Sequence, residues 1–493
     1  MSNRNVLLLY PRHVTGWQAQ PWCDIPLGLL CVGSPLVRAG YNVKIIDQRV
    51  QPQWRQILEE ELKRRPVCVG ISSSTGPQLR YALEASRLIK QISQVPVVWG
   101  GVHPSILPEQ TLEEECVDIV VQGEGEETFL ELVGALEKQT PLSEIRGLWY
   151  KDGSGIRHTP ERPFIDLNQQ PPLAWPLVEL QKYTRTVFGV ERLSFTTSRG
   201  CPHGCAFCFN TSFNKRRWRR LDSEMAVERL ADFVTRYKVK GVFLTDANFF
   251  VDLSWARRVL KGIVERNLKI VLTRLHISFE SLCRLTGEDL DLLEQAGCAC
   301  LAVGIESGSP RIRTLLHKEI DNDRLLELNR RLRRRSFILH YFFMIGFPTE
   351  TKEEIKETVD LFSRLVDENP RASKSVNIYT PYPGTELFDR CVKEGLQAPE
   401  RAEGWIGFNY RSNLPSSGWQ DKKTRQLVAM LDFCSFFVGS RSYRQPFKKT
   451  NNWVIFLSRL YAPLARLRVR NLFARLPLEV KLAKLFGLYG KQE

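Results

Sequence analysis

The chain has 493 residues, of which 43% are hydrophobic and 25% are charged. This composition excludes a disordered chain, and the length predicts two or three globular domains. The net charge of +15 is concentrated near one end, because twelve basic and two acidic residues follow Ser440. No run of about 18 apolar residues occurs, so we expect no membrane-spanning helix.

Residues 1–145 alternate short apolar runs with amphipathic stretches. The apolar runs predict buried strands at 5–10, 42–46, 67–71, 95–99 and 118–121, with helices at 28–39, 54–64, 79–91 and 128–137. This order predicts an α/β domain with an open parallel sheet, whose ligand lies at the carboxyl ends of the strands. The first thirteen residues lack the apolar core of a signal peptide, so we expect a cytoplasmic protein with reduced cysteines.

Residues 146–190 are rich in proline and show little periodicity, so we predict a linker. A second alternation follows, with strands expected at 193–197, 241–245, 270–274, 300–305, 338–345 and 376–379, and helices at 223–237, 254–266, 286–296, 323–335 and 352–366. Six β/α units predict a partial (β/α)6 barrel over residues 191–400. Residues 401–493 are predicted to be mainly helical, ending in a basic amphipathic tail.

The segment TSRGCPHGCAFCFN, residues 197–210, carries Cys201, Cys205 and Cys208 directly after a predicted strand. Thiolates hold iron–sulfur clusters, and three cysteines on one loop can ligate three of four irons while the last stays open to a substrate. A structural zinc site is an alternative, but it wants a fourth ligand, and His203 lies too close to Cys201 to serve easily. A redox disulfide is the other alternative.

The spacing C-x3-C-x2-C, with Phe207 before the last cysteine, resembles the signature loop of the radical S-adenosylmethionine (SAM) superfamily. The resemblance implies a [4Fe–4S] cluster on the three cysteines, whose open iron binds SAM and whose electron cleaves SAM to methionine and a 5′-deoxyadenosyl radical. Three later segments resemble the SAM-binding motifs of that superfamily in their usual order, namely TDANF (245–249), GIESG (304–308) and GFPTE (346–350). The implied SAM-contacting residues are Phe207, Asp246, Asn248, Gly304, Glu306, Ser307 and Gly346. Alternatively, Asp246 and Asn248 only cap a helix.

Four segments of the first domain are similar, as an ordered set, to the Rossmann-like cobalamin-binding domain that precedes many radical SAM enzymes. They are residues 24–47, GISSST (70–75), WGGVHP (99–104) and GEGEETF (123–129). Small residues at strand ends let a bulky planar ligand approach the backbone. The resemblance implies a cobalamin pocket that includes Ser73, Ser74, Thr75, Gly100 and Gly101. The sequence Gln48-Arg49-Val50 departs from the D-x-H-x-x-G motif, which leaves the axial ligand of cobalt open, and a domain that keeps the fold without the ligand is the alternative.

The two-domain layout is similar to that of anaerobic magnesium-protoporphyrin ester cyclases and hopanoid methylases. It implies a cobalamin-dependent radical SAM enzyme, and we predict methylation of an unactivated carbon in a lipophilic or tetrapyrrole-like small molecule. One SAM would be the radical source and a second would remethylate cobalt. An oxidative cyclase with the same cofactors is the nearest alternative, and a non-catalytic sensor of cobalamin or SAM is the alternative of another class.

RNA methylthiolation is disfavoured because its additional N-terminal cysteines are not found. No catalytic acid or base stands out.

The tail, residues 451–491, interleaves apolar and basic residues at helical spacing. Such a stretch either contacts an anionic membrane surface or packs on the barrel with a solvated basic face. For a cytoplasmic protein, the membrane surface would be the inner face of the membrane. A flavodoxin or ferredoxin is the electron donor that the resemblance implies. We expect no nucleic-acid partner, because no recognised nucleic-acid module accompanies the charge.

Overall fold

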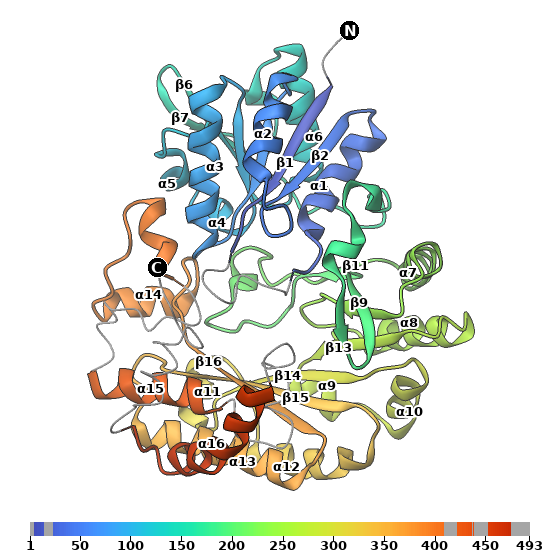
Figure 1. Cartoon of the computed structure of the whole chain (residues 1–493), viewed down its shortest axis with the longest axis vertical. Helices are drawn as coiled ribbons and strands as arrows, with labels where there is room; N and C mark the ends of the chain where they lie inside the picture. The colour runs from blue at the N-terminus through green and yellow to red at the C-terminus, as the bar shows by residue number, and fades with distance from the viewer. Residues whose placement is uncertain (1–3, 14–22, 409–421, 436, 438–451, 475–493) are drawn as a thin grey trace.

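A computed structural model of the chain describes residues 4–13, 23–408, 422–435, 437 and 452–474 (Figure 1). In these residues two seven-stranded sheets form the centres of two α/β units. Figure 1 shows the first unit, in blue, above the second, in green to orange. The α/β class, the parallel first sheet and the partial barrel that the sequence predicts are confirmed, as is a helical C-terminal region.

The first sheet has the strand order β2-β1-β3-β4-β5-β6-β7, and β1 to β5 are parallel. Its apolar runs alternate between two faces: along β1, Val6 and Leu8 pack in the core on one side, and Leu7 and Leu9 in the core on the other. Both faces are therefore covered by helices. The parallel strands are β1 (Asn5–Tyr10), β2 (Asn42–Asp47), β3 (Val69–Ser72), β4 (Val97–Gly100) and β5 (Ile119–Val121); the helices are α1 (Leu27–Arg38), α2 (Trp54–Lys63), α3 (Gln78–Ile92), α4 (Val102–Ile106), α5 (Pro108–Leu112) and α6 (Gly125–Lys138).

The proline-rich stretch at 146–190 carries more structure than its composition predicts. Strands β6 (Leu148–Asp152) and β7 (Gly155–His158) form an antiparallel hairpin that extends the first sheet beyond β5. Further along, Trp175 is buried and stacks on Phe233, with ring centroids 4.1 Å apart. The hairpin is largely exposed and polar, so it lacks the apolar alternation by which a strand is recognised from sequence.

The second sheet has the order β16-β15-β14-β13-β12-β9-β8, with β9 and β12 to β16 parallel and β8 (Arg185–Val187) antiparallel at one edge. The strand order is open rather than circular, as a partial barrel requires. The parallel strands are β9 (Val190–Phe195), β12 (Gly241–Leu244), β13 (Val271–Ile277), β14 (Cys300–Glu306), β15 (Ile338–Ile345) and β16 (Ala372–Ile378); the helices are α7 (Ser223–Tyr237), α8 (Leu253–Glu265), α9 (Phe279–Cys283), α10 (Gly287–Gln295), α11 (Pro310–Leu315), α12 (Asn322–Arg331) and α13 (Lys352–Glu368).

A short antiparallel ribbon, β10 (Ser198–Arg199) with β11 (Arg219–Arg220), brackets the cysteine loop. After the barrel, α14 (Glu386–Lys393) and a 3₁₀ helix at Ala402–Gly407 lie beside the first unit, where the Trp405 indole N–H donates to Gln110 Oε1 at 2.7 Å. Helices α15 (Lys422–Ser435) and α16 (Asn452–Arg470) lie beside the barrel (Figure 1). Within the described ranges no helix has the length and hydropathy to cross a membrane. The end of the predicted tail, residues 475–493, lies outside the described residues.

Candidate functional site

The three clustered cysteines lie on the loop between β10 and β11, above the carboxyl end of β9. Cys201, Cys205 and Cys208 are all free and half-buried. Burial raises the pKa of Cys201, and it raises the pKa of Cys205 to about 11. Gly200 has φ of 80°, and a Cβ there would lie 2.0 Å from the carbonyl oxygen of Arg217, so only glycine permits this entry into the loop.

The donor set suits an iron–sulfur cluster, because three soft thiol ligands follow one another on one short loop. In the part of the chain that the structure describes, no three His, Cys, Asp or Glu side chains converge closely enough to hold a single metal ion. The three thiolates would each bind a different iron of a four-iron cluster, so they stand further apart than the ligands of one ion. The Asn210 amide donates a hydrogen bond to Cys208 Sγ at 3.6 Å, so a donor stands beside this sulfur.

A lysine whose side chain is only 17% exposed, Lys318, lies beside the cysteine loop. Lys318 Nζ donates to Glu306 Oε1 at 2.7 Å and to the carbonyl oxygen of Gly304 at 2.9 Å, and it lies 5.8 Å from the ring centroid of Phe207. Burial alone would lower the pKa of Lys318, but Glu306 and Cys205 raise it, and the net pKa is above the ordinary value. This cation is therefore available to offset negative charge on the loop. Three predicted SAM contacts, Phe207, Gly304 and Glu306, meet at Lys318.

Asp246 is buried and ties β12 to the start of the cysteine loop. Its Oδ1 accepts hydrogen bonds from the backbone N–H groups of Thr197 at 2.8 Å and Ser198 at 3.0 Å. Burial raises the pKa of Asp246, and these hydrogen bonds oppose that shift. Asn248 is also buried, and its Nδ2 has no hydrogen-bond partner within the described residues. An orphaned buried amide of this kind is a donor available to a ligand.

The remaining predicted SAM contacts make bonds within the protein. The Ser307 hydroxyl lies 3.0 Å from the Thr358 hydroxyl on α13, so it fixes the end of β14 to that helix. Gly346 has φ of 86°, and its N–H donates to Glu350 Oε2 at 2.5 Å. Burial raises the pKa of Glu350 to about 8.

In the first unit, glycines form a cradle at the carboxyl ends of the strands. A Cβ on Gly70 would lie 2.9 Å from both Leu8 and Phe129, and Gly101, with φ of 99°, would place a Cβ 2.6 Å from the carbonyl oxygen of Ser73. Gly123 has open space around it. This cradle is suited to the close approach of a large planar ligand such as cobalamin.

The three hydroxyl side chains that are predicted to contact cobalamin differ in their hydrogen-bond partners. Ser73 Oγ is buried without a hydrogen-bond partner among the described residues, so it is a free donor. Ser74 instead bonds Gln78 Oε1 at 2.7 Å, and Thr75 Oγ1 lies 3.0 Å from His103 Nδ1.

One cavity of about 370 Å³ joins the two sites. Its lining includes Gly70, Gly100 and Gly101 from the first unit, and Gly200 and Asn210 from the cysteine loop. A volume of this size is within the range of small-molecule sites. The structure thus brings the glycine cradle and the cysteine loop to one space, whereas Ser73, Ser74 and Thr75 are not part of its lining.

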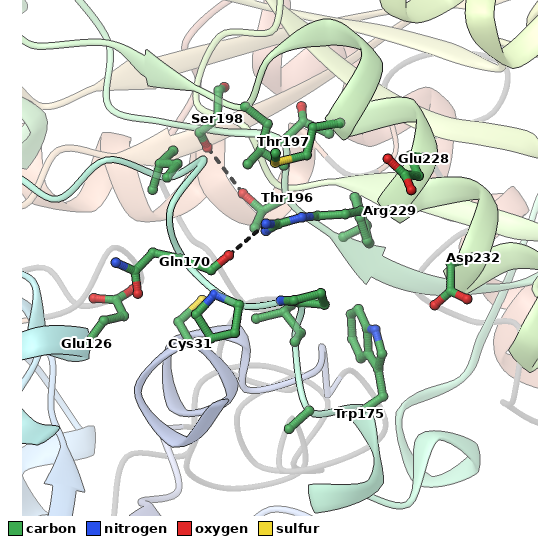
Figure 2. A pocket seen from close by; sticks show the side chains of 18 of the residues that line it. Cys31, Glu126, Gln170, Trp175, Thr196, Thr197, Ser198, Glu228, Arg229 and Asp232 are labelled. Carbon is green, nitrogen blue, oxygen red and sulfur yellow. Dashed lines mark hydrogen bonds between the residues drawn. The ribbon is translucent and has the colours of Figure 1, made fainter. Parts of the chain in front are cut away.

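A second cavity of about 580 Å³ lies against the same strand segment (Figure 2). Both cavities are lined by Cys31, Glu126, Thr196, Ser198 and Arg199. The proline-rich segment and α7 supply most of the rest of its wall. Figure 2 shows Arg229 reaching across to the backbone of Gln170, whose carbonyl oxygen accepts a 2.6 Å hydrogen bond from Arg229.

Ion pairs join the two units beside these cavities. Arg199, two residues before Cys201, pairs with Glu124 at 2.8 Å and Glu126 at 2.5 Å, and Arg219 pairs with Glu124 at 2.5 Å. Burial would raise the pKa of Glu124, but Arg219 and Arg199 lower it further than burial raises it. The network holds the cysteine loop against the start of α6, which begins at Gly125.

Comparison with known proteins agrees with this arrangement. The chain matches the model of the radical SAM superfamily over residues 195–362 and that of the B12 binding domain over residues 24–133. It is 33% identical over 380 residues to an uncharacterized methyltransferase of Pyrococcus horikoshii, a match that covers 75% of this chain and 79% of that protein. The chain belongs to the B12-binding branch of the radical SAM superfamily.

Other members of this branch share nearly the whole architecture. A cytidylyl-2-hydroxyethylphosphonate methyltransferase of Streptomyces wedmorensis is 26% identical over 486 residues, covering 86% of this chain and 89% of that protein. The radical SAM methyltransferase TsrM of Kitasatospora setae superposes with a TM-score of 0.69 at 17% identity, covering 97% of this chain and all of that one. The family predicted from the motifs is thus confirmed, and the protein is a radical SAM enzyme whose cofactors are SAM, a [4Fe–4S] cluster and cobalamin.

Sequence reasoning missed two residues of this radical SAM site. Lys318 and Arg199 carry no motif of their own, and only the fold brings them to Glu306 and Glu126. Only Arg199 carries a sequence signal, because it stands two residues before Cys201.

Proposed function

We propose that the protein is a cobalamin-dependent radical SAM methyltransferase that methylates an unactivated carbon of a lipophilic or tetrapyrrole-like small molecule. The observation that carries this proposal is the cavity lined by both the glycine cradle and the cysteine loop. A carbon radical has to meet its methyl donor before another reaction consumes it, so a shared space supplies the proximity that methylation needs.

In this proposal Cys201, Cys205 and Cys208 hold the cluster. When bound, the cluster with SAM supplies a 5′-deoxyadenosyl radical, and cobalamin supplies a methyl group. Asn210 donates a hydrogen bond to the Cys208 thiolate, and Lys318 offsets part of the negative charge of the loop. The proposed SAM contacts are Phe207, Asp246, Asn248, Gly304, Glu306, Ser307 and Gly346, and the proposed cobalamin contacts are Ser73, Ser74, Thr75, Gly100 and Gly101.

The roles of the polar groups differ within this set. We assign Asp246 to positioning, because its carboxylate is occupied by the N–H groups that begin the cysteine loop. Asn248 and Ser73 have buried polar atoms without partners in the described structure, so they are the stronger candidates for direct contact with a ligand.

The experiment is anaerobic turnover of reconstituted protein with SAM that carries a CD3 group on sulfur. Candidate lipids and tetrapyrroles are supplied with a reductant, and products are analysed by mass spectrometry. Methylation predicts a product heavier than its substrate by a CD3 group that replaces one hydrogen.

Each alternative gives its own signal in the same assay. An oxidative cyclase gives a product that is lighter by hydrogen and carries no label. A non-catalytic sensor gives no 5′-deoxyadenosine at all, and that result would reject the proposal.

The basic tail supports a further part of the proposal, namely a cytoplasmic enzyme that touches the inner membrane face. On α16, Leu460, Leu464 and Leu467 are 63%, 47% and 61% exposed and recur on one face, next to exposed Arg466. Apolar side chains with a cationic rim favour an anionic lipid surface. Sedimentation with phosphatidylglycerol vesicles, but not phosphatidylcholine vesicles, should capture the protein, and Leu464→Ser with Leu467→Ser should release it. A flavodoxin or ferredoxin would supply the electron.

A further inference from the structure

The inner face of the partial barrel is polar. Strands β13, β15 and β16 alternate buried residues with half-buried ones. The buried set packs beneath the helices, as Phe343 does against Phe362 of α13 at 5.7 Å between ring centroids. A closed barrel fills its interior with branched apolar residues. Here the half-buried inner positions instead include Arg274, His276, His340, Phe342, Ser373 and Ser375.

Ring contacts place these side chains on one continuous surface. The Phe342 ring centroid lies 6.2 Å from that of His276 and 4.8 Å from that of His340, and the guanidinium carbon of Arg274 lies 5.7 Å from it. His276 Nδ1 lies 3.1 Å from the backbone carbonyl oxygen of Asp246. Because the Asp246 side chain anchors the start of the cysteine loop, this surface is continuous with the site where the radical forms.

The surface carries more positive than negative charge. Arg192 of β9 faces Asp24, whose carboxylate lies 3.0 Å from it and also accepts a hydrogen bond from Ser194 at 3.1 Å. The guanidinium carbon of Arg192 lies 4.6 Å from the ring centroid of Phe243, and that ring lies 6.1 Å from the ring of His276, so Arg192 borders the same surface. Burial lowers the pKa of Arg192, Asp24 opposes that shift, and the positive charge of Arg274 lowers the pKa further. Within the described residues, Arg192 Nη1 is buried without a hydrogen-bond partner, and no carboxylate oxygen lies within 4.0 Å of Arg274.

Hydroxyl donors stand beside the guanidinium groups. His340 Nδ1 lies 2.8 Å from Ser373 Oγ, and its Nε2 lies 2.8 Å from Ser375 Oγ. Burial, reinforced by Arg274, lowers the pKa of His340 to about 3, so the ring is neutral and donates from one nitrogen only. One of the two serines therefore accepts from the ring and keeps its own hydroxyl hydrogen for another acceptor.

We propose that this surface binds an anionic group of the substrate, a carboxylate, phosphate or phosphonate, through the guanidinium groups of Arg192 and Arg274. Guanidinium groups bind such oxyanions through paired, charge-assisted hydrogen bonds. The Asp24 carboxylate, which is half-exposed, shows that an oxyanion fits against Arg192. The inference rests on the proposed function and narrows it: the lipophilic or tetrapyrrole-like substrate carries an acid group.

The test measures binding without turnover. Reconstituted protein with SAM and no reductant is titrated with methylphosphonate, inorganic phosphate, acetate and neutral acetamide, and binding is followed by ligand-observed NMR. We expect at least one oxyanion to bind and acetamide not to bind. The oxyanion that binds most tightly identifies the class of acid group on the substrate. Arg274→Gln and Arg192→Gln should each weaken that binding about tenfold or more, as loss of a charge-assisted hydrogen bond implies.

Matched variants separate charge from folding. Arg274→Lys keeps the charge but loses the paired hydrogen bonds of the guanidinium group, so it should weaken binding less than Arg274→Gln does, and Asp24→Asn should strengthen binding. Arg333→Gln makes the same charge change at an exposed position and should leave binding unchanged. If Arg333→Gln weakens binding as much as Arg274→Gln and Arg192→Gln do, or if acetamide binds as tightly as the oxyanions, the inference is wrong. Because no turnover is involved, failure of SAM cleavage would overturn the proposed function and leave this result standing.

Discussion

Replacing Arg199 by glutamine tests whether the ion pairs between the two units hold the cysteine loop in place. The Glu124 and Glu126 side chains that Arg199 bridges are only 5% and 4% exposed. Glu124 keeps Arg219, but Glu126 has no second ion-pair partner in the described residues. Removing one partner of a buried ion pair costs about 3–5 kcal/mol. We expect about 3 kcal/mol, the lower end, because the Arg199 side chain is 24% exposed and one carboxylate stays paired.

The assay is urea unfolding followed by tryptophan fluorescence, with Arg333→Gln as the control. The double variant Arg199→Gln, Glu126→Gln removes both charges. It should recover at least half of the free energy of unfolding that Arg199→Gln alone loses. The net pKa of Glu124 lies below its ordinary value of 4.5, so its stabilisation is present above pH 4.5 and disappears as the pH falls through that lowered pKa. An unchanged unfolding midpoint for Arg199→Gln, or a double variant whose loss equals the sum of the single losses, would refute the reasoning.

Three further variants test separate parts of the structure. Lys318→Met should cost about 3–5 kcal/mol, because Glu306 is left buried without its partner, and should weaken SAM binding in equilibrium dialysis. Gly101→Ala, with φ of 99° and a Cβ 2.6 Å from the Ser73 carbonyl oxygen, should destabilise the first unit by more than about 1 kcal/mol and abolish the visible absorbance of bound cobalamin. Burial raises the pKa of Glu350 from 4.5 to about 8, so the stability that its protonated form contributes falls as the pH rises from 4.5 to 8. Glu350→Gln should remove this loss of stability. Parallel profiles of melting temperature against pH for the two proteins would contradict the prediction.

The strands and the cysteine loop could be predicted because their signals are local. Apolar runs such as NVLLLY define a strand buried on both faces, and the spacing of Cys201, Cys205 and Cys208 lies within eight residues. The hairpin of β6 and β7 could not be predicted, because its residues are exposed and follow no apolar period.

Side-chain direction was the part of the site that sequence could not supply. Within the motif GISSST, Ser73 keeps a free buried hydroxyl, whereas Ser74 turns to Gln78. Arg192 and Arg274 lie 82 residues apart in the chain, and they come to one sheet face only because β9 and β13 both flank β12. Nothing in the residues around either arginine distinguishes it from an exposed one.

The central claim is tested most directly by the iron content and SAM cleavage of protein purified without oxygen. Wild-type protein, and Cys283→Ala as a control for loss of a half-buried thiol outside the loop, should bind a [4Fe–4S] cluster and release 5′-deoxyadenosine when reduced with SAM. Replacing Cys201, Cys205 and Cys208 together by alanine should remove both the iron and the 5′-deoxyadenosine. Iron-free wild-type protein, or a triple variant that still cleaves SAM, would contradict the account.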